Sequence, residues 1–429
     1  MDDRLQTDER WRTRAWHWQV GATAILPLLP TWGALSLVGV VVAVWARYWR
    51  RLLGRPLMWG WALLAAWLIV TACCASDRGA AWLGLANVLP FVAMYAATSA
   101  LVQRPEQLRV LAVAIAAPAA IAAVLGLGQI WAGWTTPPAW EPVLGWTLVA
   151  GGNPPGRLAS AFMYANICAV YLLVGLALGV MLVLDAWQQL QRWLLVAAFG
   201  GTVAIAAALG LTASRNAWAL GLLVGLAYAV FLGWRWLVAA AIAIAAVVAG
   251  ASFAPPSPLQ QGLRAIVPDY VWLRLSDRLH PDRPEALLRS TQWEFAWQLA
   301  RARPWTGWGL RSFTPLYQDR TDVWLGHPHN LPLMLFAETG IPATLLLVAM
   351  VGSVMVRTVR LLWVWPALAP MPGSGRPWHR DRLVLFGFAV AFSSCTLFNL
   401  LDVTLFDLRA NAIAWLLLGA IDGVTHRDR

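Results

Sequence analysis

The chain has 429 residues, of which 59% are hydrophobic and only 12% are charged, and its mean hydropathy is +0.60. This composition excludes an ordinary soluble globular protein. Apolar stretches of about 18 or more residues recur, each long enough to cross a hydrocarbon core of ~30 Å. The sequence therefore predicts an all-α polytopic membrane protein. Residues 1–18 are charged and aromatic without an apolar core, so no cleavable signal peptide is expected.

The formal net charge is +11, and all 32 basic residues are arginine. The absence of lysine excludes lysine-base and Schiff-base chemistry. The remaining cation is the arginine guanidinium, which is suited to binding phosphate through two parallel hydrogen bonds. Most of the charge follows the membrane topology described below, so we expect no nucleic-acid partner. The cysteines have no metal-ligand spacing, and no cofactor is expected.

About twelve transmembrane helices are predicted. The expected spans, of which the first is short, are 17–30, 33–47, 56–74, 79–101, 108–131, 158–184, 193–212, 214–232, 235–252, 329–357, 383–402 and 405–424. This pattern divides the chain into an N-terminal transmembrane bundle of about nine spans (1–252), a long loop (253–326) and a C-terminal transmembrane bundle of about three spans (327–429). Within the loop, 284–303 is predicted to form an amphipathic helix, because proline opens and closes it.

Arginine placement orients these spans. If the N-terminus is inside, the even-numbered connections are cytoplasmic, and they carry most of the arginines between spans. These are Arg47, Arg50, Arg51, Arg55, Arg104, Arg109, Arg192, Arg235, Arg357, Arg360, Arg376, Arg380 and Arg382, with Arg427 and Arg429 at the C-terminus. The pattern follows the positive-inside rule, so both termini are predicted to be cytoplasmic and the long loop to be periplasmic.

The first candidate for chemistry is His327-Pro328-His329-Asn330, where the long loop re-enters the membrane. Imidazole is the side chain best matched to proton transfer near neutral pH. A structural alternative is available, because histidine is tolerated at membrane interfaces and Pro328 could simply start a helix.

The second candidate is arginine on the outer side. Arg215 lies in a turn so tight that it must sit at or just below the outer interface, where a charge is costly unless it is paired or faces a wet cavity. The alternatives are snorkelling to the headgroups or pairing with Asp402 or Asp407. Arg157 starts another span on the same side, and Arg289 lies on the predicted loop helix.

These outer segments could converge on one cavity. Three guanidiniums would suit a diphosphate, and the imidazole of His329 would suit abstraction of a hydroxyl proton. No metal-binding carboxylate pair is visible on the outer side, so metal-free chemistry is expected.

Several short motifs resemble the O-antigen ligase and O-antigen polymerase superfamily of bacterial membrane glycan-transfer proteins, while Leu405-Phe406-Asp407 and the Trp-rich composition look most like cyanobacterial members. The short motifs are Thr212-Ala213-Ser214-Arg215-Asn216-Ala217-Trp218, Arg289-x-x-x-Trp293, Ala302-Arg303-Pro304-Trp305-Thr306-Gly307-Trp308-Gly309-x-x-x-Phe313, His327-Pro328-His329-Asn330 and Glu338-Thr339-Gly340-Ile341-Pro342. The resemblance covers about 60% of the chain, from residue 150 to the end.

The resemblance implies a GT-C-like inner-membrane glycosyltransferase with its active site at the periplasmic face. It would move a glycan from an undecaprenyl-diphosphate carrier to a sugar hydroxyl, without a metal and with inversion. His329 would be the base, and Arg215 and Arg289 would hold the diphosphate. The other implied substrate-binding residues are Arg157, which would assist the two arginines, His327, which could share the base role, Asn330 and Glu338, which would orient the base, and Trp293 and Ser214.

Three functions stay open at this point. An O-antigen ligase would use lipid A–core as acceptor. A polymerase of O-antigen or exopolysaccharide would use a second carrier-linked glycan. A more distant alternative is an inorganic-carbon (bicarbonate) transporter, although a transporter would favour internal repeats and broken helices at mid-membrane depth.

Overall fold

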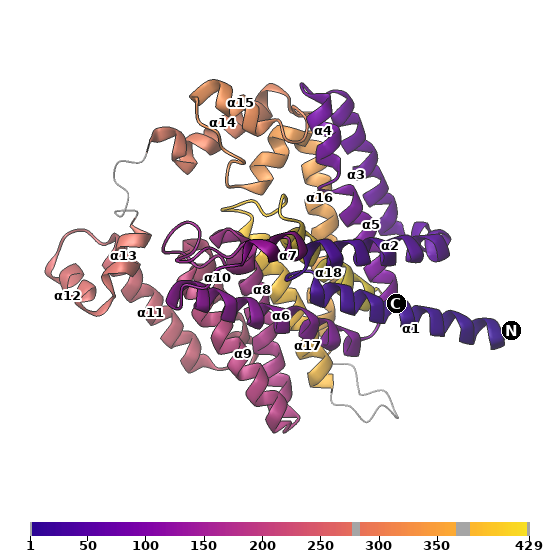
Figure 1. Cartoon of the computed structure of the whole chain (residues 1–429), viewed down its shortest axis with the longest axis horizontal. Helices are drawn as coiled ribbons and strands as arrows, with labels where there is room; N and C mark the ends of the chain where they lie inside the picture. Colours follow the sequence, from indigo (N-terminus) through magenta and orange to yellow (C-terminus); the bar gives the residue numbers. More distant parts are fainter. Residues whose placement is uncertain (1, 277–283, 366–377, 427–429) are drawn as a thin grey trace.

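The computed structural model describes residues 2–276, 284–365 and 378–426, which are helical and contain no β-strand (Figure 1). Arg376, Arg427 and Arg429 lie outside these residues. The α-helices are α1 (Asp2–Ile25), α2 (Pro30–Leu53), α3 (Pro56–Cys73), α4 (Arg78–Leu85), α5 (Leu89–Leu101), α6 (Pro105–Trp131), α7 (Glu141–Leu144), α8 (Ala165–Gln188), α9 (Arg192–Leu211), α10 (Arg215–Phe231), α11 (Arg235–Phe253), α12 (Pro258–Ile266), α13 (Asp269–Leu275), α14 (Arg289–Ala302), α15 (Phe313–Thr321), α16 (Leu331–Val364), α17 (Trp378–Phe398) and α18 (Leu408–Thr425).

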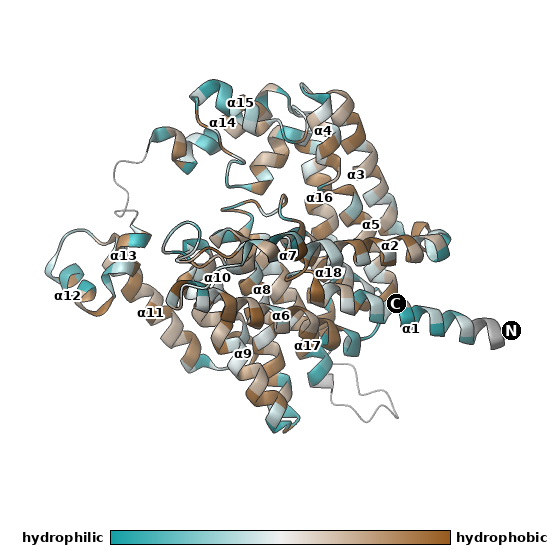
Figure 2. Cartoon of the chain, in the orientation of Figure 1, coloured by the Kyte–Doolittle hydropathy of each residue, from teal (hydrophilic) through white to brown (hydrophobic). Residues whose placement is uncertain are grey.

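Ten helical segments of the described chain are long and apolar enough to cross a membrane, and α10 is a shorter apolar helix of 17 residues. The prediction of an all-α polytopic membrane protein is confirmed. The short stretch expected at 17–30 instead forms the end of α1, whose first half is charged, and α1 does not qualify as a span. Polar residues gather on the start of α1 and on the helices between α11 and α16 (Figure 2).

The two ends of the chain lie on one side of the bundle. Near the N-terminus, Arg12 Nη1 donates to Gln103 Oε1 at 2.8 Å. Near the C-terminus, α18 packs so closely on α5 that a Cβ on Gly423 would lie 2.0 Å from the Val102 carbonyl oxygen. Both ends therefore flank the connection between α5 and α6. That this side is cytoplasmic stays a prediction.

Helices from both predicted transmembrane bundles share one hydrophobic core. The ring of Trp61 on α3 lies 5.2 Å from that of Tyr95 on α5 and 5.3 Å from that of Trp415 on α18. Trp61 and Tyr95 are fully buried. The boundaries 1–252, 253–326 and 327–429 therefore describe order along the chain, and whether they separate three units stays a prediction.

The long helix α16 is interrupted near its N-terminal end. Gly340 has φ 80° and ψ 167°, a conformation that is essentially restricted to glycine. A Cβ at this position would lie 2.1 Å from the Trp305 carbonyl oxygen. The next residue, Ile341, donates its N–H to the Pro304 carbonyl at 2.8 Å. The loop backbone therefore completes the hydrogen bonding of the broken helix.

The interruption also frees carbonyl groups, and the same loop satisfies them. Trp308 N–H donates to the Ala337 carbonyl at 3.0 Å, and Gly309 N–H donates to the Glu338 carbonyl at 2.8 Å. Buried backbone groups of this kind must find partners. The two motifs that include Gly307 and Gly340 are thus the two halves of one contact that fixes the loop on α16.

A small apolar cluster holds the loop helices together. Its buried members are Ala296 and Leu299 on α14, Phe313 and Tyr317 on α15, and Ala337 on α16. The Phe313 and Tyr317 rings stack with centroids 5.3 Å apart. Because α14 and α15 have their own core on α16, α14 can hold side chains in fixed positions above the transmembrane helices.

Candidate active site

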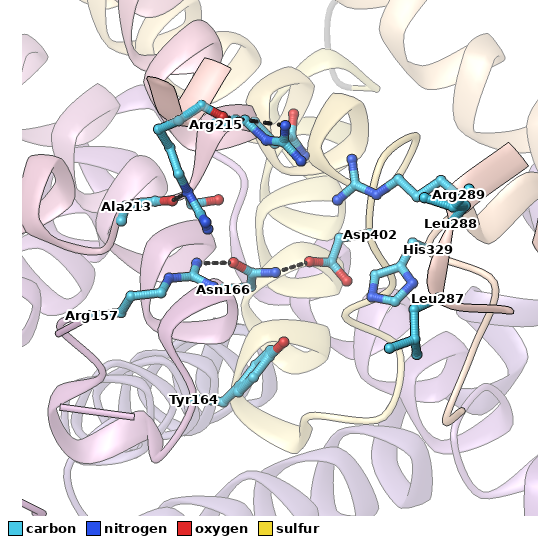
Figure 3. Close-up of a pocket in the computed structure, with 13 residues that line it drawn as sticks. Arg157, Tyr164, Asn166, Ala213, Arg215, Leu287, Leu288, Arg289, His329 and Asp402 are labelled. Carbon is cyan, nitrogen blue, oxygen red and sulfur yellow. Dashed lines mark hydrogen bonds between the residues drawn. The ribbon is translucent and has the colours of Figure 1, made fainter. Parts of the chain in front are cut away.

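A cavity of about 380 Å³ lies where α10, α13, α14 and the segments before α8, α16 and α18 meet (Figure 3). It brings together side chains from distant parts of the sequence. The lining residues are Arg157, Tyr164, Asn166, Ala213, Ser214, Arg215, Asn216, Arg274, Leu287, Leu288, Arg289, His329 and Asp402. All four residues predicted to converge, Arg157, Arg215, Arg289 and His329, are among them.

A chain of hydrogen bonds crosses the cavity floor. Arg157 donates from Nε to the Thr212 carbonyl at 2.8 Å and from Nη2 to Asn166 Oδ1 at 2.6 Å. Asn166 Nδ2 donates in turn to Asp402 Oδ2 at 2.6 Å. In Figure 3, Arg157 approaches from one side, while Arg289 and His329 lie on the other side. The floor thus fixes the guanidinium of Arg157 and the carboxylate of Asp402 relative to each other.

The start of α10 and the helix α13 contribute two further arginines. Arg215 Nη1 donates to the Arg274 carbonyl at 3.3 Å, and Arg274 Nε donates to the Ala213 carbonyl at 3.3 Å. Ser214 precedes α10, lines the cavity and is buried. The two backbone contacts couple the turn before α10 to α13, so that the guanidiniums of both arginines reach the cavity.

The cavity carries more positive than negative charge. Among its described lining residues are four arginines and one acidic residue, Asp402. Arg157, Arg274 and Arg289 alone outnumber this carboxylate by three to one. Burial and the nearby charge of Arg274 lower the pKa of Arg157, but a guanidinium remains protonated in proteins. A ligand with two or more negative charges would complement this surface.

His329 lies on the opposite wall from Arg157 and is held in an uncommon backbone conformation. Its φ is 53°, in the left-handed region that non-glycine residues seldom adopt. Its Nδ1 lies 2.9 Å from Oε1 of Gln292, which is buried on α14. Such strain persists only where the surroundings enforce it, and it is concentrated at functional sites.

His327 has a different environment. It is not among the residues that line the cavity. Its Nδ1 accepts the backbone N–H of His329 at 3.2 Å, and its Nε2 lies 3.7 Å from Asp402 Oδ1. The two imidazoles meet edge to face, with centroids 4.6 Å apart. His327 therefore contacts both the His329 backbone and Asp402 from outside the cavity lining.

Both imidazoles favour the neutral form. Burial, assisted by His327 and Arg289 and opposed by Asp402, lowers the pKa of His329 to about 4. Burial also lowers the pKa of His327, where Asp402 opposes the effect and Arg289 adds to it. At neutral pH, His329 is thus a neutral imidazole that can accept a proton.

The other predicted substrate-binding residues support the site from outside the cavity. Trp293 Nε1 donates to the Pro328 carbonyl at 2.9 Å, and Asn330 Oδ1 caps α16 by accepting the Leu333 N–H at 2.9 Å. Glu338 does not reach the cavity. It is buried farther along α16, where its Oε1 accepts the Phe313 N–H at 3.1 Å. The functional roles assigned to these residues stay predictions.

His327, His329 and Asp402 are close enough to be considered as cation ligands, because one ligand atom of each lies within 4.8 Å of the others. The contacts of His327 argue against a cation shared by these three side chains. The Nδ1 of a neutral His327 accepts an N–H, so its proton lies on Nε2 and faces Asp402, and no lone pair is directed at a shared cation. The geometry fits a hydrogen-bonded group better than a metal centre.

Among the side chains whose hydrogen bonds build the site, Asn166, Arg274, Gln292 and Asp402 were not predicted. Asp402 was considered only as a possible partner of Arg215. Gln292 follows Arg289 by three residues, and this helical spacing is the one sequence signal that could have placed it near the cavity. An uncharged amide side chain cannot be recognised as a functional group from its residue type alone.

The comparison with protein families gives one match. Residues 200–348 match the family model described as O-Antigen ligase. No curated protein matches the chain. The matched region contains Arg215, Arg289 and His329, which the cavity brings together. Over these residues the chain is similar to the O-antigen ligase family, which supports the resemblance to the superfamily of O-antigen ligases and polymerases.

Proposed function

We propose that this protein is a metal-independent, inverting glycosyltransferase of the O-antigen ligase type. It moves a glycan from an undecaprenyl-diphosphate carrier to a sugar hydroxyl of lipid A–core. The observation that carries the proposal is the cavity itself, where several guanidiniums face one neutral imidazole. The first group of side chains suits a diphosphate leaving group, and the second suits an acceptor hydroxyl.

The reaction is a single displacement. The acceptor hydroxyl oxygen attacks the anomeric carbon while the bond from that carbon to the diphosphate oxygen breaks. The hydroxyl proton moves to His329 Nε2, and the diphosphate leaves with the bonding electrons, still attached to its lipid. Arg215, Arg289 and Arg157 stabilise the negative charge that develops on it, and Arg274 joins them.

Inversion follows from the absence of a suitable second nucleophile among the described lining residues. Their one carboxylate, Asp402, accepts a hydrogen bond from Asn166 on Oδ2 and from the Val403 N–H on Oδ1. With His327 Nε2 3.7 Å from Oδ1, these contacts favour a role for Asp402 in holding Asn166 and His327 in place. Attack by the acceptor from the face opposite the diphosphate then inverts the anomeric centre.

The base is His329 and not His327. His329 lines the cavity, whereas His327 does not. The Nδ1 of His327 is occupied by the His329 N–H, and its Nε2 faces Asp402. A bound diphosphate would offset the positive charge of Arg289, which is one of the groups that lower the pKa of His329, and would make the imidazole a stronger base.

The proposed location is the bacterial inner membrane, with both termini cytoplasmic and the cavity periplasmic. The arginine asymmetry between connections supports this orientation. So does the placement of both chain ends beside the connection between α5 and α6. In this orientation, a carrier in the outer leaflet of the inner membrane and the acceptor both have access to the cavity.

The test is a surface-glycan gel from a strain that lacks the protein, complemented with wild type, His329→Ala or the exposed control His17→Ala. We expect His329→Ala to accumulate in the membrane but to leave long-chain glycan on the carrier and none on lipid A. His17→Ala should behave as wild type.

Two other outcomes distinguish the alternatives. Single repeats on lipid A, with long chains lost, would make the protein a polymerase that uses the same donor chemistry. A normal glycan ladder in the strain with His329→Ala would overturn the proposed reaction, and bicarbonate uptake would then be measured.

A further inference from the structure

We propose that Gln292 is a positioning residue that fixes the tautomer of His329, so that its Nδ1 carries the proton and its Nε2 presents a lone pair to the cavity. This inference rests on the proposed function for its role in catalysis. The tautomer itself follows from hydrogen bonds alone and can be tested without any activity.

A contact on the side away from His329 determines how the amide group of Gln292 is oriented. Its Nε2 lies 3.5 Å from the Ala286 carbonyl oxygen, which also accepts the Tyr317 hydroxyl at 2.6 Å. A carbonyl oxygen can only accept, so the amide group facing it must be the NH2. The amide oxygen of Gln292 therefore faces His329.

This orientation determines where the imidazole proton lies. Gln292 Oε1 is 2.9 Å from His329 Nδ1. An amide oxygen cannot donate, so the contact is a hydrogen bond only if Nδ1 carries the proton. In a neutral imidazole, Nε2 is then the unprotonated nitrogen. Because Gln292 is 1% exposed, water cannot replace it in this role.

The backbone supports the same arrangement. Trp293, the next residue of α14, donates Nε1–H to the Pro328 carbonyl at 2.9 Å. The left-handed φ of 53° at His329 turns its N–H towards His327 Nδ1. Two consecutive residues of α14 thus hold the ring and the backbone of the segment that contains the base.

The same helix also begins with Arg289, three residues before Gln292. One rigid element therefore carries a phosphate-binding guanidinium and the group that orients the base. The charged and titratable groups that act on His329 are Arg289 on α14, His327 on its own segment and Asp402 before α18. A change at Gln292 leaves all three in place.

The first measurement is of the tautomer, in full-length protein reconstituted in nanodiscs. Histidine is labelled with ¹⁵N on the ring, and the His329 signals are identified among the six histidines by comparison with His329→Ala. We expect the wild type to show a protonated Nδ1 and an unprotonated Nε2 at neutral pH. In Gln292→Leu we expect loss of this single pattern. A wild-type signal from the opposite tautomer would overturn the proposal.

The second measurement is of transfer rates against pH. His329 must be neutral to act, and its pKa is about 4, so kcat/KM for wild type should hold as pH falls from 7 and should be lost only near that value. Gln292→Glu places a carboxylate on Nδ1–H and raises the pKa of the base. The acid limb of the kcat/KM profile of this variant should therefore shift to higher pH by about one unit or more.

Gln292→Leu should lower kcat by about 10–100-fold, the usual cost of losing a group that orients a histidine, without raising the KM for the donor. The matched control is Gln298→Leu, on the exposed face of the same helix. An acid limb of Gln292→Glu at the wild-type pH would overturn the proposal, even if Gln292→Leu failed to fold. Failure of the proposed function is distinct, because it would appear as wild-type transfer that does not require His329.

Discussion

Arginine has different surroundings at the two ends of the helical bundle. At the end predicted to be cytoplasmic, Asp185 accepts hydrogen bonds from Arg109 and Arg380, and Asp422 accepts one from Arg357 at 2.7 Å. There, each of these buried carboxylates is paired with at least one partly buried guanidinium. At the outer end, four arginines and one carboxylate are found among the described residues that line the cavity.

On the proposed function, the same residue type stabilises the fold at one end and binds the substrate at the other. A buried guanidinium beside a buried carboxylate is neutralised inside the protein and cannot bind a further anion strongly. An excess of guanidiniums over carboxylates among the described residues of a cavity favours the entry of an anion. The outer arginines should therefore affect binding and catalysis, and the inner arginines should affect folding.

The largest expected effect is that of Arg289→Ala. Loss of a guanidinium that contacts a phosphate costs about 2–5 kcal/mol, so kcat/KM for transfer should fall by about 30- to 5,000-fold while the unfolding temperature stays within a few degrees of wild type. The measurement is transfer of a carrier-linked glycan by purified protein. Arg320→Ala, on the exposed end of α15, is the control. Equal transfer by both variants would contradict the binding role of the outer arginines.

Arg357→Ala should have the opposite profile. It leaves the Asp422 carboxylate, which is 4% exposed, with the Tyr95 hydroxyl as its remaining side-chain partner among the described residues. Removal of one member of a buried ion pair destabilises a protein by about 3 kcal/mol or more. We expect a lower unfolding temperature in detergent, with transfer per folded molecule unchanged.

The double variant Arg357→Ala/Asp422→Asn tests the reason for that loss. It removes the uncompensated charge and should recover part of the stability. If Arg357→Ala instead reduced transfer as strongly as Arg289→Ala without affecting stability, the distinction between the two ends would be wrong.

Much of the candidate site could be predicted from the sequence, because its central residues carry chemical signals. A histidine pair at a membrane re-entry point and an arginine in a tight outer turn are informative by type and position. His329 and Arg215 were found in this way, and Arg289 from its place on the predicted loop helix and the family resemblance. The structure brings all three to one cavity. The all-α membrane class followed from hydropathy alone.

The partners of these residues could not be predicted, for two physical reasons. The first is distance along the chain, since Asn166 and Asp402 are 236 residues apart and only the fold brings them to 2.6 Å. The second is direction. Glu338 is close to His329 in sequence, but the rise along α16 from Leu331 to Glu338 is about 10 Å, which carries its carboxylate away from the cavity to the Phe313 N–H. Gln292, which does touch His329, belongs to a different helix.

The smallest expected effect concerns Asp8, which shows that exposure matters as well as pairing. Asp8 Oδ1 accepts hydrogen bonds from Arg47 at 3.0 Å and from the Tyr48 hydroxyl at 2.9 Å, but the side chains of Asp8 and Arg47 are 30% and 38% exposed. Water and salt screen such a pair, so it adds little to stability. Asp8→Asn should leave both the unfolding temperature and the transfer rate unchanged, measured beside Arg357→Ala in the same detergent. A loss of stability as large as that of Arg357→Ala would mean that α1 is held in place mainly by its charges, and that burial does not decide which of the inner arginines stabilise the fold.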